Sequence, residues 1–250
     1  MEKMEPPKKH YRSIFLSDIH IGLKYSRVEE LLTFLKENEC DTLYLVGDII
    51  DGWALKRKWY WDENANLLIQ KLLRKARHGT RVVYLSGNHD EFLRFFERPL
   101  AFGNIEIQDD VIHTAADGMK YLVIHGDKFD GVLNNMDWIS HMGAFLYDGI
   151  LWLSDKIAAF RRKMGKDYWS LAHVVKTKAK QAVKFMTNFE VALIEEAKRR
   201  GCNGVVAGHI HCACHKTIDN IEYYNCGSFL EHCHAVVEHE DGRMEILQID

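Results

Sequence analysis

Aspartate, histidine and asparagine recur in six short fragments of this 250-residue chain. In chain order they are Ser-Asp18-Ile-His20, Gly-Asp48-Ile-Ile-Asp51, Gly-Asn88-His89-Asp90, His125-Gly-Asp127, Gly-His209-Ile-His211 and Asn225-Cys-Gly-Ser228. Imidazole, carboxylate and amide groups together suit manganese, iron or zinc, whereas oxygen ligands alone would suit magnesium or calcium. Any single fragment arises often by chance. Six of them in one chain favour a metal-dependent enzyme.

The fragments hold enough ligands for two cations. Two divalent ions about 3.5 to 4 Å apart need roughly seven donors, and one carboxylate must reach both ions. The seven candidates are Asp18, His20, Asp48, Asn88, His125, His209 and His211. Asp18 and His20 are two residues apart, so an extended segment would point both side chains the same way and one ion could bind both. The sequence therefore predicts a dinuclear metal centre.

Buried strands are predicted to position these side chains. Each of the first five fragments follows an apolar, β-branched run, and the runs are 13–16, 42–46, 81–85, 121–124 and 204–207. The ligands are therefore expected where strands end and loops begin. Apolar residues at helical spacing predict one helix over 28–35 and another over 67–76, which stops at His78-Gly79.

The second half of the chain adds short strands at 222–225, 234–238 and 244–249. Alternating strands and helices followed by a run of strands indicate an α/β fold with two packed sheets and helices outside. Between Leu133 and about Arg200 lies a proline-free, helix-compatible insertion that is expected to cover the site. The length and the 47% hydrophobic content fit one domain over residues 1–250 with that insertion.

The ordered series from Asp18 to Ser228 resembles the calcineurin-like metallophosphoesterase superfamily. The resemblance implies a four-layer αββα sandwich in which the helical insertion acts as a lid. It also implies that Asp48 bridges the two ions and acts in catalysis, and that His89 touches the reacting phosphate. One site would be completed by Asp18, His20 and His211, and the other by Asn88, His125 and His209.

Within the superfamily, the chain is most similar to the UDP-2,3-diacylglucosamine diphosphatase group of lipid A synthesis. The similarity rests on the length, on Asp51-Gly-Trp53 and on the insertion. It implies two metal ions, manganese first and iron or zinc as alternatives, and hydrolysis of a lipid-linked nucleotide to UMP and a lipid 1-phosphate. Well-characterised members carry arginine at the position of His89. A phosphoesterase for soluble nucleotides or phosphoesters is the alternative, and a non-catalytic binding module is a second.

Substrate contacts are expected from Asn88 and His89, from Trp53 and Arg57 in a loop over 53–61, and from Arg161 and Arg162 in the insertion. Within the insertion, Asp137, Asp148 and Asp155 share one stripe of a largely apolar helix. Its longest uncharged run, ten residues, is too short to span a membrane. The apolar surface needs a partner, which is a second helix or subunit, or an acyl groove or membrane interface.

The distribution of charge indicates which kinds of binding partner to expect. The basic cluster Arg161, Arg162, Lys163 and Lys166 beside apolar residues fits anionic lipid headgroups, although a charge run is usually a solvated face. A net charge of -3 and a pI near 6.5 give no general attraction to nucleic acid. The charged segment 1–12 does not resemble a signal peptide, so a cytoplasmic location is expected, with peripheral contact at the inner membrane. The oligomeric state stays open.

Overall fold

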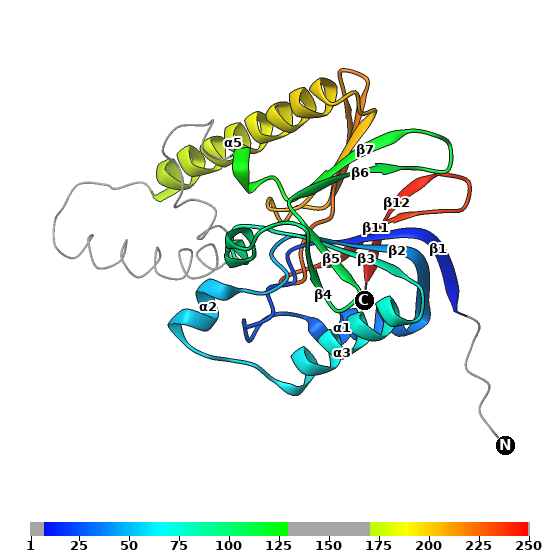
Figure 1. Cartoon of the computed structure of the whole chain (residues 1–250). Helices are drawn as coiled ribbons and strands as arrows, with labels where there is room; N and C mark the ends of the chain where they lie inside the picture. Colours follow the sequence, from blue (N-terminus) through cyan, green and yellow to red (C-terminus); the bar gives the residue numbers. More distant parts are fainter. Residues whose placement is uncertain (1–7, 130–170, 250) are drawn as a thin grey trace, which may run out of the picture. The chain divides into compact units, whose positions relative to one another are not determined.

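The computed structural model describes residues 8–129 and 171–249, except for the side chains of 171–182 and 184 (Figure 1). Contacts divide the chain into two compact units, residues 1–127 with 193–250 and residues 128–192. The strands of the described residues, β1 to β12, all belong to the first unit. That unit also carries every predicted metal ligand.

A seven-stranded sheet has the order β12-β11-β1-β2-β3-β5-β4. Its central strands β1, β2, β3 and β5 are parallel neighbours, whereas β4, β11 and β12 pair antiparallel. Parallel strands bring their carboxyl ends to one edge of a sheet, where α/β proteins bind ligands. The strands are β1 (Lys9–Leu16), β2 (Asn38–Val46), β3 (Arg81–Leu85), β4 (Leu100–Phe102), β5 (Ile105–Gln108), β11 (Cys233–Glu238) and β12 (Met244–Ile249).

A five-stranded sheet has the order β6-β7-β8-β10-β9. Here β7, β8 and β10 run parallel, and β6 and β9 pair antiparallel at the two edges. The strands are β6 (Asp110–Thr114), β7 (Lys120–Ile124), β8 (Gly204–Ala207), β9 (Cys214–Ile218) and β10 (Ile221–Asn225). This sheet therefore also presents three parallel carboxyl ends.

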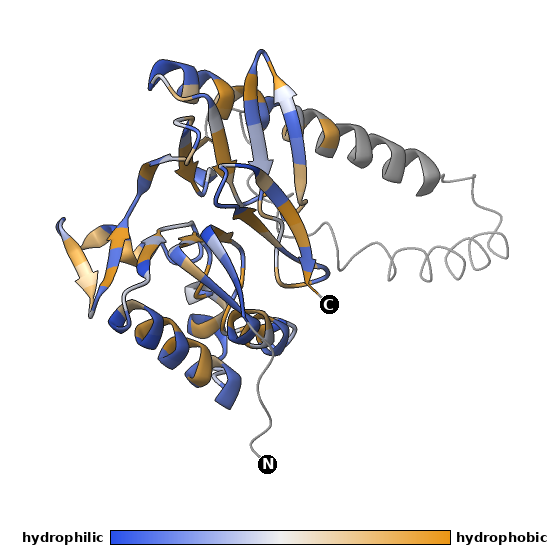
Figure 2. Ribbon diagram, turned by 90° about the vertical axis from the view of Figure 1, so that its right-hand side faces the viewer, coloured by the Kyte–Doolittle hydropathy of each residue, from blue (hydrophilic) through white to orange (hydrophobic). Residues whose placement is uncertain are grey.

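The alternation of side chains along β1 shows how the layers stack. Ile14 and Leu16 share a core cluster with Leu31 of α1 (Val28–Glu37) and with residues of α3 (Glu63–Arg77). Phe15, on the opposite face of the strand, packs in a second cluster that includes Val123 of β7. Side chains of a strand point to its two faces in turn. One face of the seven-stranded sheet is thus covered by helices and the other by the second sheet (Figure 2).

The predicted α/β sandwich is confirmed, and so are the strands and the two helices read from the sequence. The loop predicted over 53–61 is wrong for its first half, because α2 (Gly52–Arg57) begins there. Asp51 starts this helix, since its Oδ1 accepts a hydrogen bond from the Ala54 backbone N–H at 2.7 Å. A short 3-10 helix, η1 (Glu91–Phe95), follows the third ligand fragment.

The helix α5 (Leu171–Arg199) falls within the predicted insertion. The Asp137, Asp148 and Asp155 stripe, its apolar neighbours and the basic cluster from Arg161 to Lys166 lie outside the described residues. The single domain with a lid therefore stays a prediction. Among the described helices, none is both long and apolar enough to pass through a membrane.

Candidate metal centre

The loops after β1, β2, β7 and β8 are joined by backbone hydrogen bonds beside the predicted ligands. Asp18 N–H donates to the Gly47 carbonyl at 3.1 Å, and His20 N–H donates to the Asp48 carbonyl at 2.9 Å. Gly208 N–H donates to the His125 carbonyl at 3.2 Å, which links the fragments after β7 and β8 of the five-stranded sheet. Loops that are far apart in sequence thus hold their polar side chains in one place.

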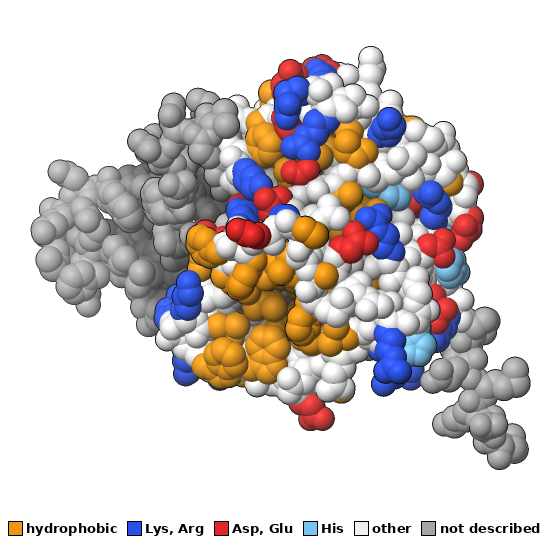
Figure 3. All heavy atoms as spheres, viewed as in Figure 1, with side chains coloured by type: hydrophobic (Ala, Val, Ile, Leu, Met, Phe, Trp, Pro, Cys, Tyr) orange, Lys and Arg blue, Asp and Glu red, His pale blue; other side chains and the backbone are white. Residues whose placement is uncertain are grey.

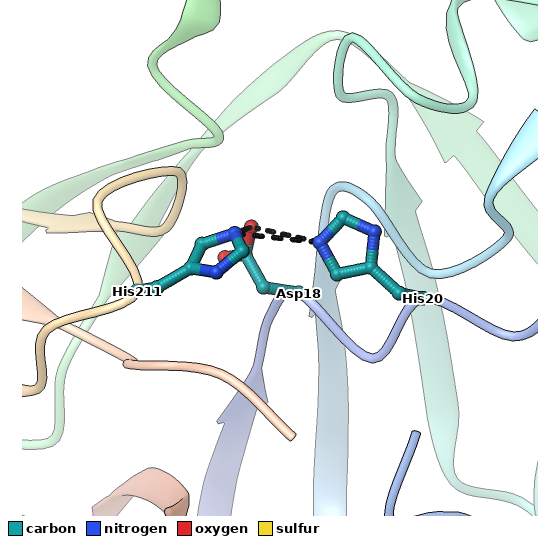
Figure 4. A group of neighbouring side chains, drawn as sticks. All are labelled: Asp18, His20 and His211. Atoms are coloured by element: carbon teal, nitrogen blue, oxygen red, sulfur yellow. Dashed lines mark hydrogen bonds and ion pairs between the residues drawn. The ribbon is translucent and has the colours of Figure 1, made fainter. Parts of the chain in front are cut away.

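Six of the seven predicted ligands form two compact groups. Asp18, His20 and His211 place one ligand atom each within 4.8 Å of one another, and so do Asp48, His125 and His209. In the first group His211 Nε2 lies 3.0 Å from Asp18 Oδ1 and 3.3 Å from His20 Nε2 (Figure 4). His125 Nε2 lies 3.5 Å from Asp18 Oδ1 and 3.5 Å from Asp48 Oδ2, so the two groups adjoin.

Asn88, the seventh predicted ligand, supplies the test of whether metal ions fit. Its side-chain oxygen Oδ1 is buried and accepts no hydrogen bond from the described residues. Buried acceptors are almost always paired, so an unpaired one calls for an explanation. The next residue, His89, donates its backbone N–H to Asp48 Oδ1 at 2.8 Å, which holds Asn88 beside the second group. A cation at that group would give the Asn88 oxygen a partner, and the donor set suits such a cation.

Five of the predicted ligands have left-handed backbone. The φ angles are 52° at Asp18, 53° at His20, 54° at Asp48, 70° at His209 and 57° at His211. The segment Asp18-x-His20 is therefore not extended, and both side chains still reach the same group. Non-glycine residues enter this region at a cost of about 1–2 kcal/mol each. Strain of this kind persists only where the surrounding structure fixes it, and it gathers at functional sites.

Glycines at two positions allow the ligand loops to approach closely. A Cβ on Gly87 would lie 2.2 Å from Asp48 Oδ1, and a Cβ on Gly208 would lie 2.7 Å from Asp18 Oδ2. Both distances are far below van der Waals contact, so any side chain there would push a ligand aside. The small residues that begin these fragments are thus a packing requirement of the site.

Asp51 orients two of the histidines. Its Oδ2 lies 3.1 Å from His20 Nδ1 and 3.0 Å from His89 Nδ1. Burial alone would raise the pKa of the Asp51 carboxyl, but the hydrogen bonds with His20 and His89 lower it below its ordinary value. A carboxylate on the far nitrogen of a ligand histidine fixes the ring and makes it a better ligand. Asp51 lies in one of the six fragments, but the sequence pattern did not predict that it would orient these histidines.

Asp90 ties the second and third fragments together. Its carboxylate accepts hydrogen bonds from Ile49 N–H at 2.9 Å, Gly87 N–H at 2.5 Å and the Tyr84 hydroxyl at 2.6 Å. Burial raises the pKa of Asp90, and the nearby charge of Asp48 adds to the rise. Asn225 likewise joins two fragments, because its side-chain N–H donates to the Gly208 carbonyl at 2.7 Å.

The predicted substrate contacts are only partly brought together. The Trp53 ring lies 4.3 Å, centroid to centroid, from the His89 ring, so it borders the metal centre. Arg57 is exposed at the end of α2. Arg161 and Arg162 lie outside the described residues.

Comparison with known proteins identifies the family. The model of the family described as calcineurin-like phosphoesterase matches residues 11–213. The chain belongs to this family. It is 22% identical over 236 residues to a UDP-2,3-diacylglucosamine hydrolase of Aliivibrio fischeri, an alignment that covers 88% of this chain and 93% of that protein. It is also 24% identical over 173 residues to the DNA polymerase II small subunit of Methanothermobacter thermautotrophicus, covering 56% of this chain and 35% of that one.

A solved structure agrees on the fold. A hypothetical protein from Pyrococcus horikoshii aligns with a TM-score of 0.53 at 10% identity, over 96% of this chain and 88% of that one. As a calcineurin-like phosphoesterase with a hydrolase among its relatives, the protein is a phosphoester hydrolase. Its family uses divalent metal ions, and the described residues include groups that could hold them.

Proposed function

We propose that this calcineurin-like phosphoesterase hydrolyses the pyrophosphate bond of UDP-2,3-diacylglucosamine or of a closely similar lipid-linked nucleotide. The products are UMP and a lipid 1-phosphate. The observation that carries the proposal is the similarity to a UDP-2,3-diacylglucosamine hydrolase over 93% of that protein's length. The alternative, a soluble nucleotide or phosphoester substrate, is favoured by His89, where the characterised group carries arginine.

The seven donors are proposed to hold two divalent ions. When bound, such ions supply an acidified water near neutral pH and neutralise phosphate charge. Manganese is proposed first, with iron or zinc as alternatives, because the donors mix imidazole with oxygen. Asp48 is the proposed shared carboxylate: its Oδ1 accepts the His89 N–H, and its Oδ2 faces His125 Nε2 at 3.5 Å.

His89 is the proposed catalytic residue that contacts the phosphate. Asp51 holds Nδ1 of its ring, and Nε2 lies on the side of the metal ligands, 3.9 Å from Asp48 Oδ2. Burial lowers the pKa of His89, but the surrounding carboxylates of Asp51, Asp48 and Asp18 outweigh it and raise the pKa above its ordinary value. A protonated imidazole in this place can stabilise phosphate charge or protonate the leaving oxygen.

Product analysis with a panel of substrates tests the proposal. Purified, manganese-loaded protein is incubated with UDP-2,3-diacylglucosamine in detergent micelles, with soluble UDP-sugars and with a chromogenic phosphodiester, in water enriched in ¹⁸O. We expect UMP carrying the heavy oxygen from the acylated substrate, because water attacks the α-phosphorus. Turnover of the soluble compounds alone would refute the lipid substrate and establish the alternative.

An anionic membrane surface is the proposed partner, and a cytoplasmic, membrane-peripheral location goes with it. Phe95, Phe96 and Phe102 are 83%, 57% and 58% exposed. Figure 3 shows apolar side chains gathered over the region of β4. Lys56 and Arg57 are exposed at the end of α2. The start of this helix is joined to the His89 loop, because the Gly52 N–H donates to the His89 carbonyl at 3.0 Å. Aromatic and basic side chains together suit the headgroup region of an anionic bilayer.

Vesicle sedimentation tests this partner. The protein should sediment with vesicles of phosphatidylglycerol more than with vesicles of phosphatidylcholine, and Phe95→Ser with Phe96→Ser should weaken the binding. Ile112→Ser, an exposed apolar position on β6, is the matched control. If both variants sediment equally with anionic vesicles, the surface around Phe95 and Phe96 does not bind the membrane.

A further inference from the structure

Arg94, in η1, joins two of the loops that carry predicted metal ligands. Its Nη1 and Nη2 donate to the two carboxylate oxygens of Asp127 at 2.7 Å and 2.9 Å. Its Nε donates to Ser86 Oγ at 2.9 Å, and Nη2 also donates to the Ser86 carbonyl at 2.7 Å. One planar guanidinium thus fixes the loop after β7 and the loop after β3 at the same time.

Both ends of this connection lead to the same group of ligands. Asp127 Oδ1 lies 3.1 Å from His125 Nδ1, so the carboxylate that Arg94 holds also sets the orientation of the His125 ring. On the other side, Ser86 is followed by Gly87 and Asn88, whose buried oxygen is unpaired among the described residues. Asn88 is held beside Asp48, and Asp48 and His125 belong to one group.

The other group has different support. His20 is oriented by Asp51, and Asp18 accepts hydrogen bonds from Ser17 Oγ at 2.5 Å and from His209 N–H at 2.9 Å. The contacts of Arg94 with Asp127 and Ser86 touch none of these supports directly. The network of Arg94 is therefore attached directly to one half of the metal centre, and it reaches Asp18 of the other half through the His125 ring, whose Nε2 lies 3.5 Å from Asp18 Oδ1.

We propose that Arg94 is a positioning residue for one of the two metal ions, the ion held by Asp48, Asn88, His125 and His209. This inference rests on the proposed two-metal centre. Arg94 acts through Asp127 and Ser86, and it does not contact the metal or the substrate. Loss of Arg94 is expected to weaken the binding of this ion, while the ion at Asp18, His20 and His211 stays bound. Loss of an outer partner of a ligand typically weakens metal affinity about 10- to 100-fold.

Manganese titration of matched variants tests the inference. Arg94→Gln removes both the charge and the planar guanidinium. Arg94→Lys keeps the charge but cannot make the same bidentate contacts. Arg81→Gln is the matched control, because Arg81 on β3 makes a bidentate pair with Glu106 at 2.8 Å and 2.9 Å on the surface. Metal content per chain, the paramagnetic resonance spectrum of bound Mn²⁺ and the melting temperature of the metal-free proteins are measured.

We expect the native protein and Arg81→Gln to bind two ions and to show the spectrum of a coupled manganese pair. Arg94→Gln should bind one ion tightly and the second about 10- to 100-fold more weakly, with the spectrum of a single manganese. Arg94→Lys should fall between them. If Arg94→Gln does not fold, Asp127→Asn carries the same expectation.

Two other outcomes separate the possible failures. If the native protein binds two ions and Arg94→Gln binds both with unchanged affinity, or loses both equally, Arg94 does not position one site and the inference is wrong. If the native protein itself binds fewer than two ions, the proposed metal centre fails first.

Discussion

At the scale of single residues, the centre combines ordinary ligand types with unusual backbone. Residue type and order could be read from the sequence, and they led to the family that the comparison confirms. The left-handed conformation of Asp18, His20 and Asp48 could not, because no local pattern favours it at aspartate or histidine over the extended form. It is stabilised by hydrogen bonds between loops that are distant in sequence. The predicted ligands are therefore held in place by contacts between distant loops.

Replacing Asp48 tests its proposed role as the carboxylate shared by the two ions. Asp48→Ala removes the proposed shared carboxylate, so turnover should fall by at least about 10³-fold because both ions lose a ligand. The variant should still fold. The substitution leaves the His89 N–H without its acceptor, but this lowers the free energy of unfolding by only about 1–3 kcal/mol. Turnover and thermal melting are measured together. Substantial residual hydrolysis with an ordinary melting curve would contradict the bridging role.

At the scale of elements, the strands that precede the ligands were predictable because they are apolar, β-branched and buried. The strands β4, β5, β6 and β9 were not predicted, since they are short and partly exposed. Helix α2 was missed because six residues give too little periodicity, and its beginning depends on the Asp51 cap. The role of Arg94 had no local signal, because it depends on Asp127 reaching η1 across 33 positions of the chain.

Asp51 links an element to the site, and two substitutions separate its roles. Asp51→Asn keeps an oxygen that can cap α2 but removes the charge facing His20 and His89. We expect turnover about 10- to 100-fold lower with little change in stability. Asp51→Ala should lose the cap as well and unfold about 1 kcal/mol more easily. Kinetics and denaturant unfolding distinguish the two, and normal turnover in Asp51→Asn would show that the carboxylate charge is not needed.

Away from the metal ligands, the two sheets of the first unit are joined by an apolar layer and by a buried polar network around Glu238. Glu238 of β11 is fully buried, and its Oε2 lies 2.8 Å from Nε2 of His113 on β6. Its Oε1 accepts hydrogen bonds from Arg12 of β1 and from the Ala116 N–H. The network therefore connects β1 and β11 of one sheet with β6 of the other.

This network predicts a dependence of stability on pH. Burial would raise the pKa of Glu238, but the hydrogen bonds with His113 and Arg12 lower it from 4.5 to about 2. A carboxyl with a lower pKa when folded adds stability that is complete above pH 4.5 and is lost as the pH falls through about 2. Glu238→Gln breaks a buried ion pair, which costs about 3–5 kcal/mol at neutral pH. It should also flatten the loss of stability below pH 4.5. Denaturant unfolding across pH measures both, and parallel pH curves for the two proteins would exclude this role.

Anomalous X-ray diffraction from crystals grown with Mn²⁺ shows whether folding gathers the seven donors around two cations. We expect two anomalous peaks about 3.5 to 4 Å apart. Asp48 should lie between them, with Asp18, His20 and His211 around one peak and Asn88, His125 and His209 around the other. A single peak, or manganese bound by other side chains, would show that these seven donors do not form a two-metal centre.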